Sequence, residues 1–564
     1  MPYPALSNRQ NLMFIPCTMD ELKALGWERP DVILVTGDAY IDSPSCGISV
    51  IGHVLIDAGF KVGLISQPAD GTDDITRLGE PALFWGVSSG AVDSMVSNYN
   101  ADRSRRRHDD LTAGGMNNAR PDRACIAYTG LIRRYFKNTV PIVLGGIEAS
   151  LRRIVHYDYW QNAIRRSILF DSKADIIVYG MGELAALSLA QKLSDGEDYR
   201  SVPGICFISN EYPPDALELS SFEDAVSDPD IFSRMFLFFY ANAGSGRLVQ
   251  KHGARFLVHN PPSRNLTPAE LDHIYELPYE REAHPLCREK GEVRALETIR
   301  FSITTHRGCF AVCNFCSITL HQGRNVISRS EDSITREAVS ITKHPMFKGI
   351  ISDVGGAAAN MYGMGCSMEK ECVGMDCLAG EPCHSLRTDH GRLIRLLVRL
   401  SAVPQIKRLF VASGIRHDLI LADKENGRAY LKKLIDSHIS GYMRAAPEHS
   451  EQRILELMGK PHFNKFAAFK SLFEKIVEGK KTGISYYLMA AHPGCSLEDM
   501  DSLRKALGIK KNPLPGSVQI FTPTPSTVST LMYYTGKDIN GDTIFVEREM
   551  GKKLKQKKRV KVLY

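Results

Sequence analysis

The stretch ITTHRGCFAVCNFCSITLHQGR, residues 303–324, carries Cys309, Cys313 and Cys316 in a C-x3-C-x2-C spacing. Three thiolates on one tight loop can hold three irons of a cubane cluster, and they leave the fourth iron without a protein ligand. The ferredoxin spacing C-x2-C-x2-C, by contrast, comes with a further cysteine. The loop therefore predicts an iron–sulfur cluster with one iron that can bind a small molecule.

Two other interpretations compete with a cluster: half of a zinc site, or a chance group of thiols. The alternating β-branched run RFSITT, residues 300–305, predicts a strand that ends just before the cysteines. A position on the loop after a strand favours the cluster. On that loop Phe310 and Phe315 would shield the cluster from water and oxygen, and Gly308 would let the backbone approach the sulfurs closely.

This spacing, the strand before it and the glycine-rich strand ends after it resemble the radical S-adenosylmethionine (SAM) superfamily. The resemblance implies that the open iron chelates the amino and carboxylate groups of SAM. It also implies reductive cleavage of SAM to methionine and a 5′-deoxyadenosyl radical, which abstracts hydrogen from a substrate. A cellular electron donor such as flavodoxin or ferredoxin would be the partner that supplies the electron.

Length and composition indicate a globular protein of two or three domains, because 564 residues exceed one hydrophobic core. No stretch approaches the roughly 20 apolar residues that cross a bilayer, and the start MPYPALSNRQ lacks the regions of a signal peptide. Seven of the 13 cysteines fall between Cys309 and Cys383, which favours metal binding over a disulfide scaffold. We expect a cytoplasmic protein without a membrane partner.

The net charge of +6 comes from one segment, KKLKQKKRVK at residues 552–561, which holds seven Lys and Arg. Without it, 63 of the 70 basic residues remain against 64 acidic ones. The body of the chain is therefore close to neutral, and the segment reads as a solvated helix face. Charge alone gives only weak support for a nucleic-acid partner.

The alternation of strands and helices in the first part of the chain predicts a doubly wound, Rossmann-like α/β domain with ligand-facing loops at the strand C-terminal ends. The predicted strands are residues 31–37, 61–67, 82–88, 141–147 and 174–182, with helices at 48–60 and 183–195. We place this domain at residues 1–244 and a packed connector at residues 245–298.

Six further strands alternate with helices over residues 299–536. They are predicted at 300–305, 347–356, 407–415, 440–449, 483–494 and 517–525. Six strands favour a (β/α)6 partial barrel of TIM type over a closed eight-stranded one. A Cys-rich insert at residues 366–383 interrupts the barrel, and a basic tail at residues 537–564 follows it.

In such barrels the working groups lie on loops at the C-terminal ends of the strands. Asp353, Gly355 and Gly356 end the second strand and resemble the glycine-rich motif whose backbone receives the SAM amino group; an ordinary tight turn is the alternative. Ser413 and Arg416 end the third strand, where they would contact the SAM ribose or carboxylate.

Glu448 and His449 end the fourth strand, where either residue faces SAM or substrate or forms a structural ion pair. His492 ends the fifth strand as a proton donor or ligand, or as a turn residue bonded to the backbone. The sequence identifies no catalytic acid or base among them.

A second set of cysteines, Cys366, Cys372, Cys377 and Cys383, has the spacing C-x5-C-x4-C-x5-C. Four thiols within 18 residues can wrap one metal site, either tetrahedral zinc or an auxiliary iron–sulfur cluster, with His384 as a spare ligand. The alternative is a set of reduced structural thiols. The spacing does not decide between zinc and iron–sulfur.

The N-terminal alternation resembles the cobalamin-binding-type Rossmann-like domain that precedes many radical SAM barrels. The resemblance rests on GGIEAS at residues 145–150 and YGMGE at residues 179–183. The motif D-x-H-x-x-G, which supplies the histidine below the cobalt, is absent, because His53 has no aspartate two residues before it. We therefore do not expect cobalamin to bind.

The motifs RGCFAVCNFCSITLHQGR, DVGGAAANMYGMGC, ASGIRHD, APEH and FTPTPSTVSTLMYYTG together resemble the YgiQ-like family of radical SAM proteins. The resemblance spans about residues 31–536 and implies a [4Fe-4S] cluster on Cys309, Cys313 and Cys316, with SAM as the second cofactor. The run GGAAAN departs from the GGPTAN expected of the family, which puts the rigidity of that loop in doubt.

We thus expect an enzyme that cleaves SAM reductively and uses the radical on an unidentified substrate. Distant resemblance of the barrel to methylthiotransferases, together with the basic tail, extends this expectation to RNA modification. The alternative is a non-catalytic iron–sulfur sensor or electron carrier built on a radical SAM scaffold.

Overall fold

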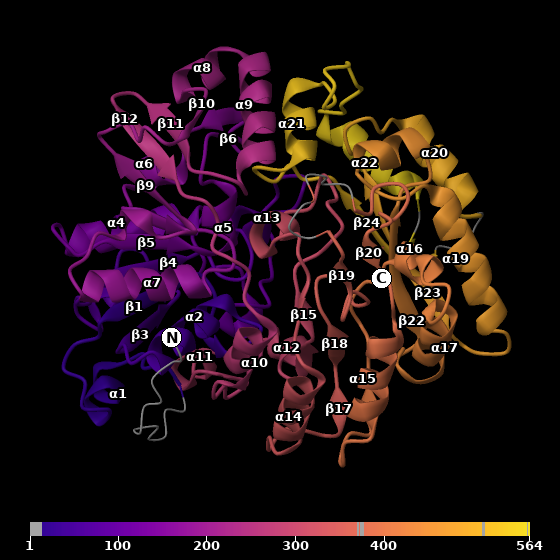
Figure 1. Cartoon of the computed structure of the whole chain (residues 1–564), viewed down its shortest axis with the longest axis horizontal. Coiled ribbons are helices and arrows are strands. Elements are labelled where there is room, and N and C mark those ends of the chain that lie inside the picture. The colour runs from indigo at the N-terminus through magenta and orange to yellow at the C-terminus, as the bar shows by residue number, and fades with distance from the viewer. Residues whose placement is uncertain (1–13, 369–371, 373–376, 510–513, 561, 564) are drawn as a thin grey trace. The chain divides into compact units, whose positions relative to one another are not determined.

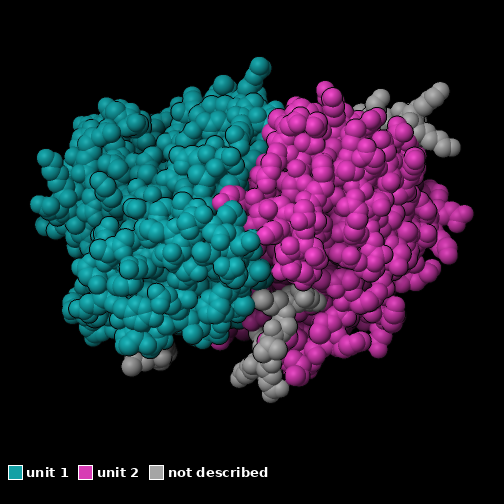
Figure 2. Space-filling view, turned by 90° about the horizontal axis from the view of Figure 1, so that it is seen from above, with its two compact units in different colours: residues 1–266, 273–300 teal, residues 267–272, 301–564 magenta. Residues whose placement is uncertain are grey.

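The computed structural model describes residues 14–368, 372, 377–509, 514–560 and 562–563. The chain folds as two compact units (Figures 1 and 2). The first unit comprises residues 1–266 and 273–300, and the second comprises residues 267–272 and 301–564. In the part of the chain that is described, every helix is too short or too polar to span a membrane.

The first unit is built on a mixed sheet of nine strands, counted over the described residues, in the order β10-β11-β12-β9-β8-β5-β4-β1-β3. The parallel strands are β1 (Val32–Thr36), β3 (Val62–Ser66), β4 (Phe84–Ser88), β5 (Ile142–Gly145) and β8 (Ile176–Val178). The others are β9 (Ile205–Ser209), β10 (Leu217–Leu219), β11 (Leu248–His252) and β12 (Arg255–His259). The doubly wound fold is confirmed.

The sheet is not purely parallel, because β9 runs antiparallel to β8 and the hairpin β11–β12 extends the sheet beyond β9. This hairpin falls within the residues predicted as a connector. The remaining strands of the unit form small ladders: β2 (Ile41–Asp42) with β13 (Glu282–Ala283), and β6 (His156–Asp158) with β7 (Ala163–Arg165).

Helices cover the sheet of the first unit, and apolar side chains on β1, β3, β5 and β8 pack against them in the core. The longer helices are α2 (Gly47–Asp57), α4 (Ala124–Tyr135), α7 (Glu183–Ser194) and α9 (Pro229–Asn242). The helix α10 (Pro268–Glu276) is divided between the units, with residues 268–272 assigned to the second. The shorter ones are α1 (Met19–Ala24), α3 (Ser94–Asn98), α5 (Gly146–Leu151), α6 (Ile168–Ser172), α8 (Phe222–Ser227), α11 (Pro285–Arg288) and α12 (Leu296–Ile299).

The second unit contains the predicted partial barrel. Its parallel strands are β14 (Ser302–Thr304), β17 (Ile350–Ile351) with β18 (Asp353–Gly355), β21 (Arg408–Leu409), β22 (Tyr442–Glu448), β23 (Gly483–Ala490) and β24 (Leu514–Ile520). A parallel bridge between Ile415 and Ala445 joins the segment after β21 to β22. The six strands thus follow one another around the barrel in chain order.

Helices alternate with these strands (Figure 1). They are α14 (Glu331–Thr342), α15 (Gly391–Ser401), α16 (His417–Ala422), α17 (Gly427–Ser437), α18 (Gln452–Leu457), α19 (Phe463–Ile476) and α20 (Leu497–Ala506), and their apolar side chains form one core with the strands. The helix α21 (Val528–Thr535) follows β24. Short elements near the barrel mouth are β15 (His306–Arg307), α13 (Ile318–Gln322), β16 (Ile327–Ser328), β19 (Gly365–Cys366) and β20 (Leu386–Arg387).

The basic tail belongs to the second unit, and its prediction as a solvated helix face holds for one side of the helix only. Lys552, Lys555, Lys558 and Arg559 are exposed, as predicted. The tail's helix α22 (Met550–Arg559) buries Lys553 and Gln556, and β25 (Val562–Leu563) pairs in parallel with β24. The Gln556 Oε1 atom accepts a hydrogen bond of 2.8 Å from Ala491 N, at the end of β23. A buried lysine is tolerated because Lys553 Nζ lies 4.7 Å from the ring centroid of Tyr533 and 3.1 Å from its hydroxyl.

Candidate cluster-binding site

The cysteine loop, residues 308–317, is tied by hydrogen bonds to two other segments at the barrel mouth. Its Asn314 donates from the backbone N to Met458 O at 2.9 Å and from Nδ2 to Leu457 O at 3.0 Å. The carbonyl of Asn314 accepts a 2.9 Å bond from Ser529 N, in α21. These bonds fix the loop against the ends of α18 and α21.

Packing around this loop also agrees with its sequence. Gly308 has φ of +87°, and a Cβ there would lie 1.9 Å from Asn325 O, so only glycine fits. Phe310 is buried in an apolar cluster against which Cys309 and Cys313 pack. Phe310 thus shares one apolar cluster with two of the three cysteines, and shielding of a cluster by Phe310 and Phe315 stays a prediction.

The three cysteines lie close enough to influence one another electrostatically. Burial and the neighbouring Cys313 raise the pKa of Cys309, and the same two causes raise the pKa of Cys316 to about 12. Lys460 acts in the opposite direction on both pKa values, and Arg416 does so on that of Cys309. Because iron binds thiolates, these two cations favour the form of the cysteines that holds metal.

Arg416 is a charged group that contacts one of these thiols. Its Nη1 lies 3.8 Å from Cys313 Sγ, while Nε and Nη2 donate to the two carboxylate oxygens of Asp418 at 2.9 and 2.5 Å. Asn360 holds its backbone, accepting from Arg416 N at 2.8 Å and donating to Arg416 O at 3.0 Å. The guanidinium is thereby fixed with one N–H group beside the sulfur.

Asn360 is in turn held by His390, which is bonded to Asp423. His390 Nδ1 lies 2.8 Å from Asp423 Oδ2, and its Nε2 lies 3.1 Å from Asn360 Nδ2. The carboxylate accepts from Nδ1, which leaves Nε2 as the acceptor for the amide. Sequence reasoning missed this chain of contacts, because its members are 30 to 33 residues apart; the only signal was Asn360 at the end of GGAAAN.

Asp353 and Ser413, both predicted to contact SAM, contact each other. Asp353 Oδ1 accepts from Ala412 N at 2.7 Å and from Ser413 N at 3.2 Å, and Oδ2 accepts from the Ser413 hydroxyl. The pair ties the first residue of β18 to the segment after β21. The structure therefore brings these residues together as a cross-link between neighbouring strands.

Gly355 and Gly356 bring the loop after β18 against the segment before the cysteines. Thr305 N donates to Gly355 O at 2.8 Å. A Cβ on Gly356 would lie 2.7 Å from His306 Nε2 and 2.8 Å from His306 O. His306 is buried with Nε2 3.0 Å from Ala358 O, and burial lowers its pKa to about 4. Glycine is thus required by close approach to a neutral histidine.

Glu448 ends β22 with φ of +64°, a conformation that a non-glycine residue rarely adopts. Its carboxylate lies 3.9 Å from Lys460 Nζ, and that ammonium group donates to Ala446 O at 2.8 Å. Both side chains are buried, and burial raises the pKa of Glu448. Lys460, which the sequence pattern does not single out, thus pairs with Glu448 and acts electrostatically on Cys309 and Cys316.

The two histidines of this region are bonded within the protein. His492 has Nδ1 2.8 Å from Pro493 O and Nε2 2.7 Å from Ser529 Oγ. His449 accepts from Glu451 N at 3.1 Å on Nδ1, and its Nε2 lies 3.6 Å from Cys495 Sγ. Both are fully buried. His492 was predicted to be either a proton donor or ligand, or a turn residue bonded to the backbone; its contact with Pro493 O agrees with the turn residue.

The second cysteine set lies on a hairpin in the same unit. β19 pairs antiparallel with β20, which places Cys366 opposite Leu386. Cys377 and Cys383 pack against the same apolar cluster as Cys309 and Cys313.

The loop side of the first unit provides a contrast. Its parallel strands lie side by side in the order β3-β1-β4-β5-β8. The chain runs outward in one direction from β1 to β3 and in the other direction from β4 to β8, so the strand order reverses between β1 and β4. Sheets of this kind bind ligands at such a reversal. Arg120 fills this point: it is fully buried, donates to Gly37 O at 3.2 Å, and pairs with Asp38 and with Asp109 at 3.1 Å.

His53, the histidine weighed for cobalamin, is bonded within the protein. Its Nε2 lies 2.7 Å from Asp42 Oδ1, which also accepts from Ser49 Oγ at 2.6 Å, and both partners are buried. His53 therefore has a structural role. The expectation that cobalamin does not bind stays a prediction.

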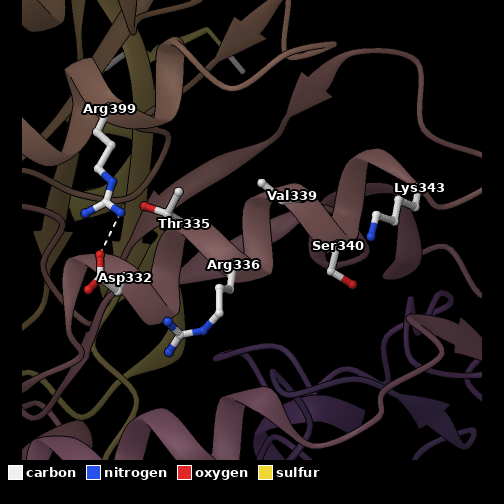
Figure 3. Close-up of a pocket in the computed structure, with 7 residues that line it drawn as sticks. All are labelled: Asp332, Thr335, Arg336, Val339, Ser340, Lys343 and Arg399. Atoms are coloured by element: carbon white, nitrogen blue, oxygen red, sulfur yellow. Dashed lines mark ion pairs between the residues drawn. The ribbon is translucent and has the colours of Figure 1, made fainter.

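A surface groove of about 340 Å³ lies on α14 and α15, and none of the predicted site residues lines it (Figure 3). Its lining residues are Asp332, Thr335, Arg336, Val339, Ser340, Lys343 and Arg399. Arg399 Nη2 pairs with Asp332 Oδ1 at 2.6 Å across it.

The family described as Radical SAM N-terminal matches residues 14–302. The chain belongs to this family. It is 49% identical to a UPF0313 protein of Fusobacterium nucleatum over 557 residues, which covers 97% of this chain and 98% of the relative. UPF0313 proteins of Thermotoga maritima and Methanosarcina acetivorans are each 44% identical, over 97% and 96% of this chain and 98% and 78% of theirs.

Two solved structures have a similar chain trace at low sequence identity. One is the radical SAM methyltransferase TsrM of Kitasatospora setae with cobalamin and a [4Fe-4S] cluster bound, at 15% identity and a TM-score of 0.49, covering 88% of this chain and 77% of that chain. The other is the cobalamin-dependent radical SAM enzyme OxsB, at 13% identity and a TM-score of 0.49, covering 92% and 57%. Family membership makes this chain a radical SAM enzyme of unspecified reaction.

Proposed function

We propose that Cys309, Cys313 and Cys316 hold a [4Fe-4S] cluster that binds SAM, and that the enzyme cleaves SAM reductively to act on a substrate still to be identified. When bound, the cluster supplies the electron for that cleavage. The observation that carries the proposal is the cysteine loop, which hydrogen bonds of Asn314 fix in place and which sets Cys313 Sγ 3.8 Å from Arg416 Nη1.

The residues around the loop have distinct roles in this proposal. Arg416 and Lys460 place two positive charges beside three thiolates and offset the negative charge of the loaded site. Asn360 and Asp418 hold the guanidinium in position. Buried aromatic and apolar side chains exclude water from the sulfurs.

The predicted contacts of SAM with Asp353, Gly355, Gly356, Ser413 and Glu448 belong to the same proposal. The backbone after β18 would receive the amino group, while the Asp353–Ser413 pair keeps the two neighbouring strand ends in register. Glu448 and Lys460, paired beside the cysteine loop, border the same space. We also propose a cytoplasmic location, which cell fractionation would check.

The test is SAM cleavage by anaerobically reconstituted protein with dithionite, read as 5′-deoxyadenosine and methionine. Cys313→Ala should lose the roughly 400 nm cluster absorption and all product. Cys46→Ser, which changes a half-buried thiol of the first unit, is the matched control and should keep both. A native cluster that cycles between redox states while SAM is neither cleaved nor bound would support the electron-carrier alternative instead.

Comparison of metabolites and modified RNA from cells with and without the protein would then identify the substrate. The expected result is one compound or one RNA position that changes and that a Cys313→Ala copy fails to restore. If RNA is unchanged while a small metabolite accumulates, the extension to RNA modification is wrong.

A further inference from the structure

The segment RSRRRH, residues 103–108, follows α3 in the first unit and holds four arginines and one histidine. All six of its residues are exposed. Without the basic tail, residues 552–561, the chain has 63 basic against 64 acidic residues, so the overall balance hides this local concentration of positive charge. Exposed basic clusters of this kind attract polyanions.

Hydrogen bonds hold the backbone of this segment in one path. Arg106 N donates to Asn98 O at 2.8 Å. Asn117, which is buried, donates from N to Arg107 O at 3.2 Å and from Nδ2 to Arg106 O at 3.0 Å. The guanidinium groups therefore extend from an ordered turn, and a ligand that binds them has little backbone to order.

Aromatic rings lie beside the arginines. The Cζ atom of Arg103 lies 4.5 Å from the ring centroid of Tyr159, and that of Arg105 lies 5.8 Å from the ring centroid of Tyr99. Trp160 joins the two tyrosines, because its ring centroid lies 5.3 Å from that of Tyr99 and 5.4 Å from that of Tyr159. Tyr99 and Trp160 are half-buried. Charge and partly exposed aromatic rings are thus found on one surface.

The arginine–aromatic surface, as we call residues 99, 103–108, 159 and 160, is only partly neutralised within the protein. Arg105 Nη1 lies 3.5 Å from Asp122 Oδ1. In the part of the chain that the structure describes, the side chains of Arg106 and Arg107 have no carboxylate partner. Guanidinium groups without an internal anion can bind phosphate oxygens by paired hydrogen bonds.

The aromatic rings narrow the class of polyanion that fits. Unpaired bases stack on aromatic rings and on guanidinium planes, whereas the bases of a duplex are stacked on one another and have no free face for Trp160. Asn100 and Gln161 are exposed and follow Tyr99 and Trp160 directly in the sequence. Their amides can bond a 2′-hydroxyl, which both donates and accepts and which DNA lacks. Single-stranded RNA fits these features best.

We propose that the arginine–aromatic surface binds single-stranded RNA, which makes RNA the class of substrate that it holds for the enzyme. This role rests on the proposed function, whereas the binding itself does not. Phosphates of the strand pair with Arg106 and Arg107, and unpaired bases stack on Trp160 and Tyr99.

The first test follows the binding of a short fluorescent single-stranded RNA of mixed sequence to the full, anaerobically reconstituted protein by anisotropy at several salt concentrations. Arg106→Ala/Arg107→Ala should weaken binding by at least about tenfold at low salt and flatten the slope of log K against log salt by about 1.4, because each phosphate contact on a single strand contributes about 0.7.

The matched control for this double variant is Arg395→Ala/Arg428→Ala. It removes the same charge from exposed arginines of α15 and α17, and it should change neither the affinity nor the slope. A native protein that does not bind the RNA, an unchanged slope in Arg106→Ala/Arg107→Ala, or an equal change in both double variants would overturn the proposal.

The second test exchanges the partner. An RNA duplex and a single-stranded DNA of the same sequence should each bind the native protein at least about fivefold more weakly than the single-stranded RNA. Equal affinity for either one would overturn the proposal. Vesicles of phosphatidylserine and phosphatidylcholine should leave the bound RNA in place. If they displace it, the surface binds a membrane and the proposal is wrong.

The third test concerns stacking. Trp160→Ala should weaken RNA binding by about fivefold or more, the effect of losing one stacked base, and Trp160→Phe should stay within about twofold of native protein. Equal affinities of the two variants would contradict the stacking. Protein that cleaves SAM but binds no RNA would contradict this proposal alone. Protein that binds RNA but yields no 5′-deoxyadenosine would contradict the proposed function alone.

Discussion

Each of the two units has a set of parallel strands whose C-terminal ends lie on one side. The side chains found near these ends differ between the units. In the first unit the reversal point between β1 and β4 is filled by Arg120, whose guanidinium pairs with Asp38 and Asp109. In the second unit the cysteine loop follows β14 and β15, and Arg416 Nη1 lies 3.8 Å from Cys313 Sγ. The first site pairs its own charges, whereas we propose that the second uses its thiols to bind a cluster.

The comparison shows that fold alone does not place the active site of this enzyme. Both arrangements put loops where α/β proteins bind ligands. The difference lies in the side chains: buried ion pairs at one set of strand ends, and glycine, thiols and neutral histidines at the other. Each prediction below changes one of these features.

The largest expected effect is on the filled end of the first unit. Arg120→Leu leaves the carboxylates of Asp38 and Asp109 buried without their partner, which should cost about 3–5 kcal/mol of unfolding free energy. All three tryptophans of the chain lie in the first unit, so that fluorescence during urea unfolding reports on this unit.

The matched control for that variant is Arg134→Leu. Arg134 is 58% exposed and pairs with the exposed Asp70, so its loss should cost less than about 1 kcal/mol. If Arg120→Leu were as mild as the control, the ion pairs would not be what closes this site, and the comparison would break.

The next effect concerns pH and the barrel mouth. The pKa of His306 falls from 6.5 unfolded to about 4 folded, because burial disfavours its charged form. The folded state thus binds fewer protons, and this stabilisation, present above pH 6.5, is lost as the pH falls through 4; its full size is roughly 3 kcal/mol. Hydrogen exchange of second-unit peptides from pH 7 to 4 should show a weaker pH dependence in His306→Asn than in native protein.

A smaller effect tests the close approach of the two segments at the mouth. Gly356→Ala should cost about 1–3 kcal/mol, because the new Cβ would overlap His306. Gly414→Ala is the matched control, since a Cβ there meets nothing within 4 Å. The denaturant concentration at which the cluster absorption disappears measures both. Equal loss in the two variants would contradict the packing argument.

The smallest effect lies outside both strand-end sites. Arg399→Ala removes the exposed ion pair with Asp332 in the surface groove, and it should change stability by less than about 1 kcal/mol. The rate of SAM cleavage should stay as in native protein. A large loss of cleavage would show that the groove contributes to the reaction. The difference between the two sets of strand ends would then not explain where the reaction takes place.

Much of this architecture is predictable from the chain, because its strands and helices have clear hydrophobic periods and its cysteines have a telling spacing. The six barrel strands and the five parallel strands of the first unit lie where the pattern places them. Asn360, His390 and Lys460 could not be found this way, since their partners are set by tertiary packing over distances of 12 to 56 residues.

Two other features escape local patterns for a different reason. The burial of Lys553 and Gln556 depends on the shape of the surface formed by α20 and β23, and composition alone indicates a solvated tail. The sheet of the first unit has antiparallel strands because β12 of the hairpin β11–β12 pairs with β9. Hydrophobic periodicity predicts that a strand forms but not which strand it pairs with.

Three hydrogen bonds of Asn314 hold the cysteine loop, to the backbone at Leu457, Met458 and Ser529. Two of them are made by the main-chain atoms of Asn314, and one is made by its side chain. A substitution at residue 314 therefore removes a single bond, and the path of the loop depends more on the backbone of its neighbours than on the identity of this side chain.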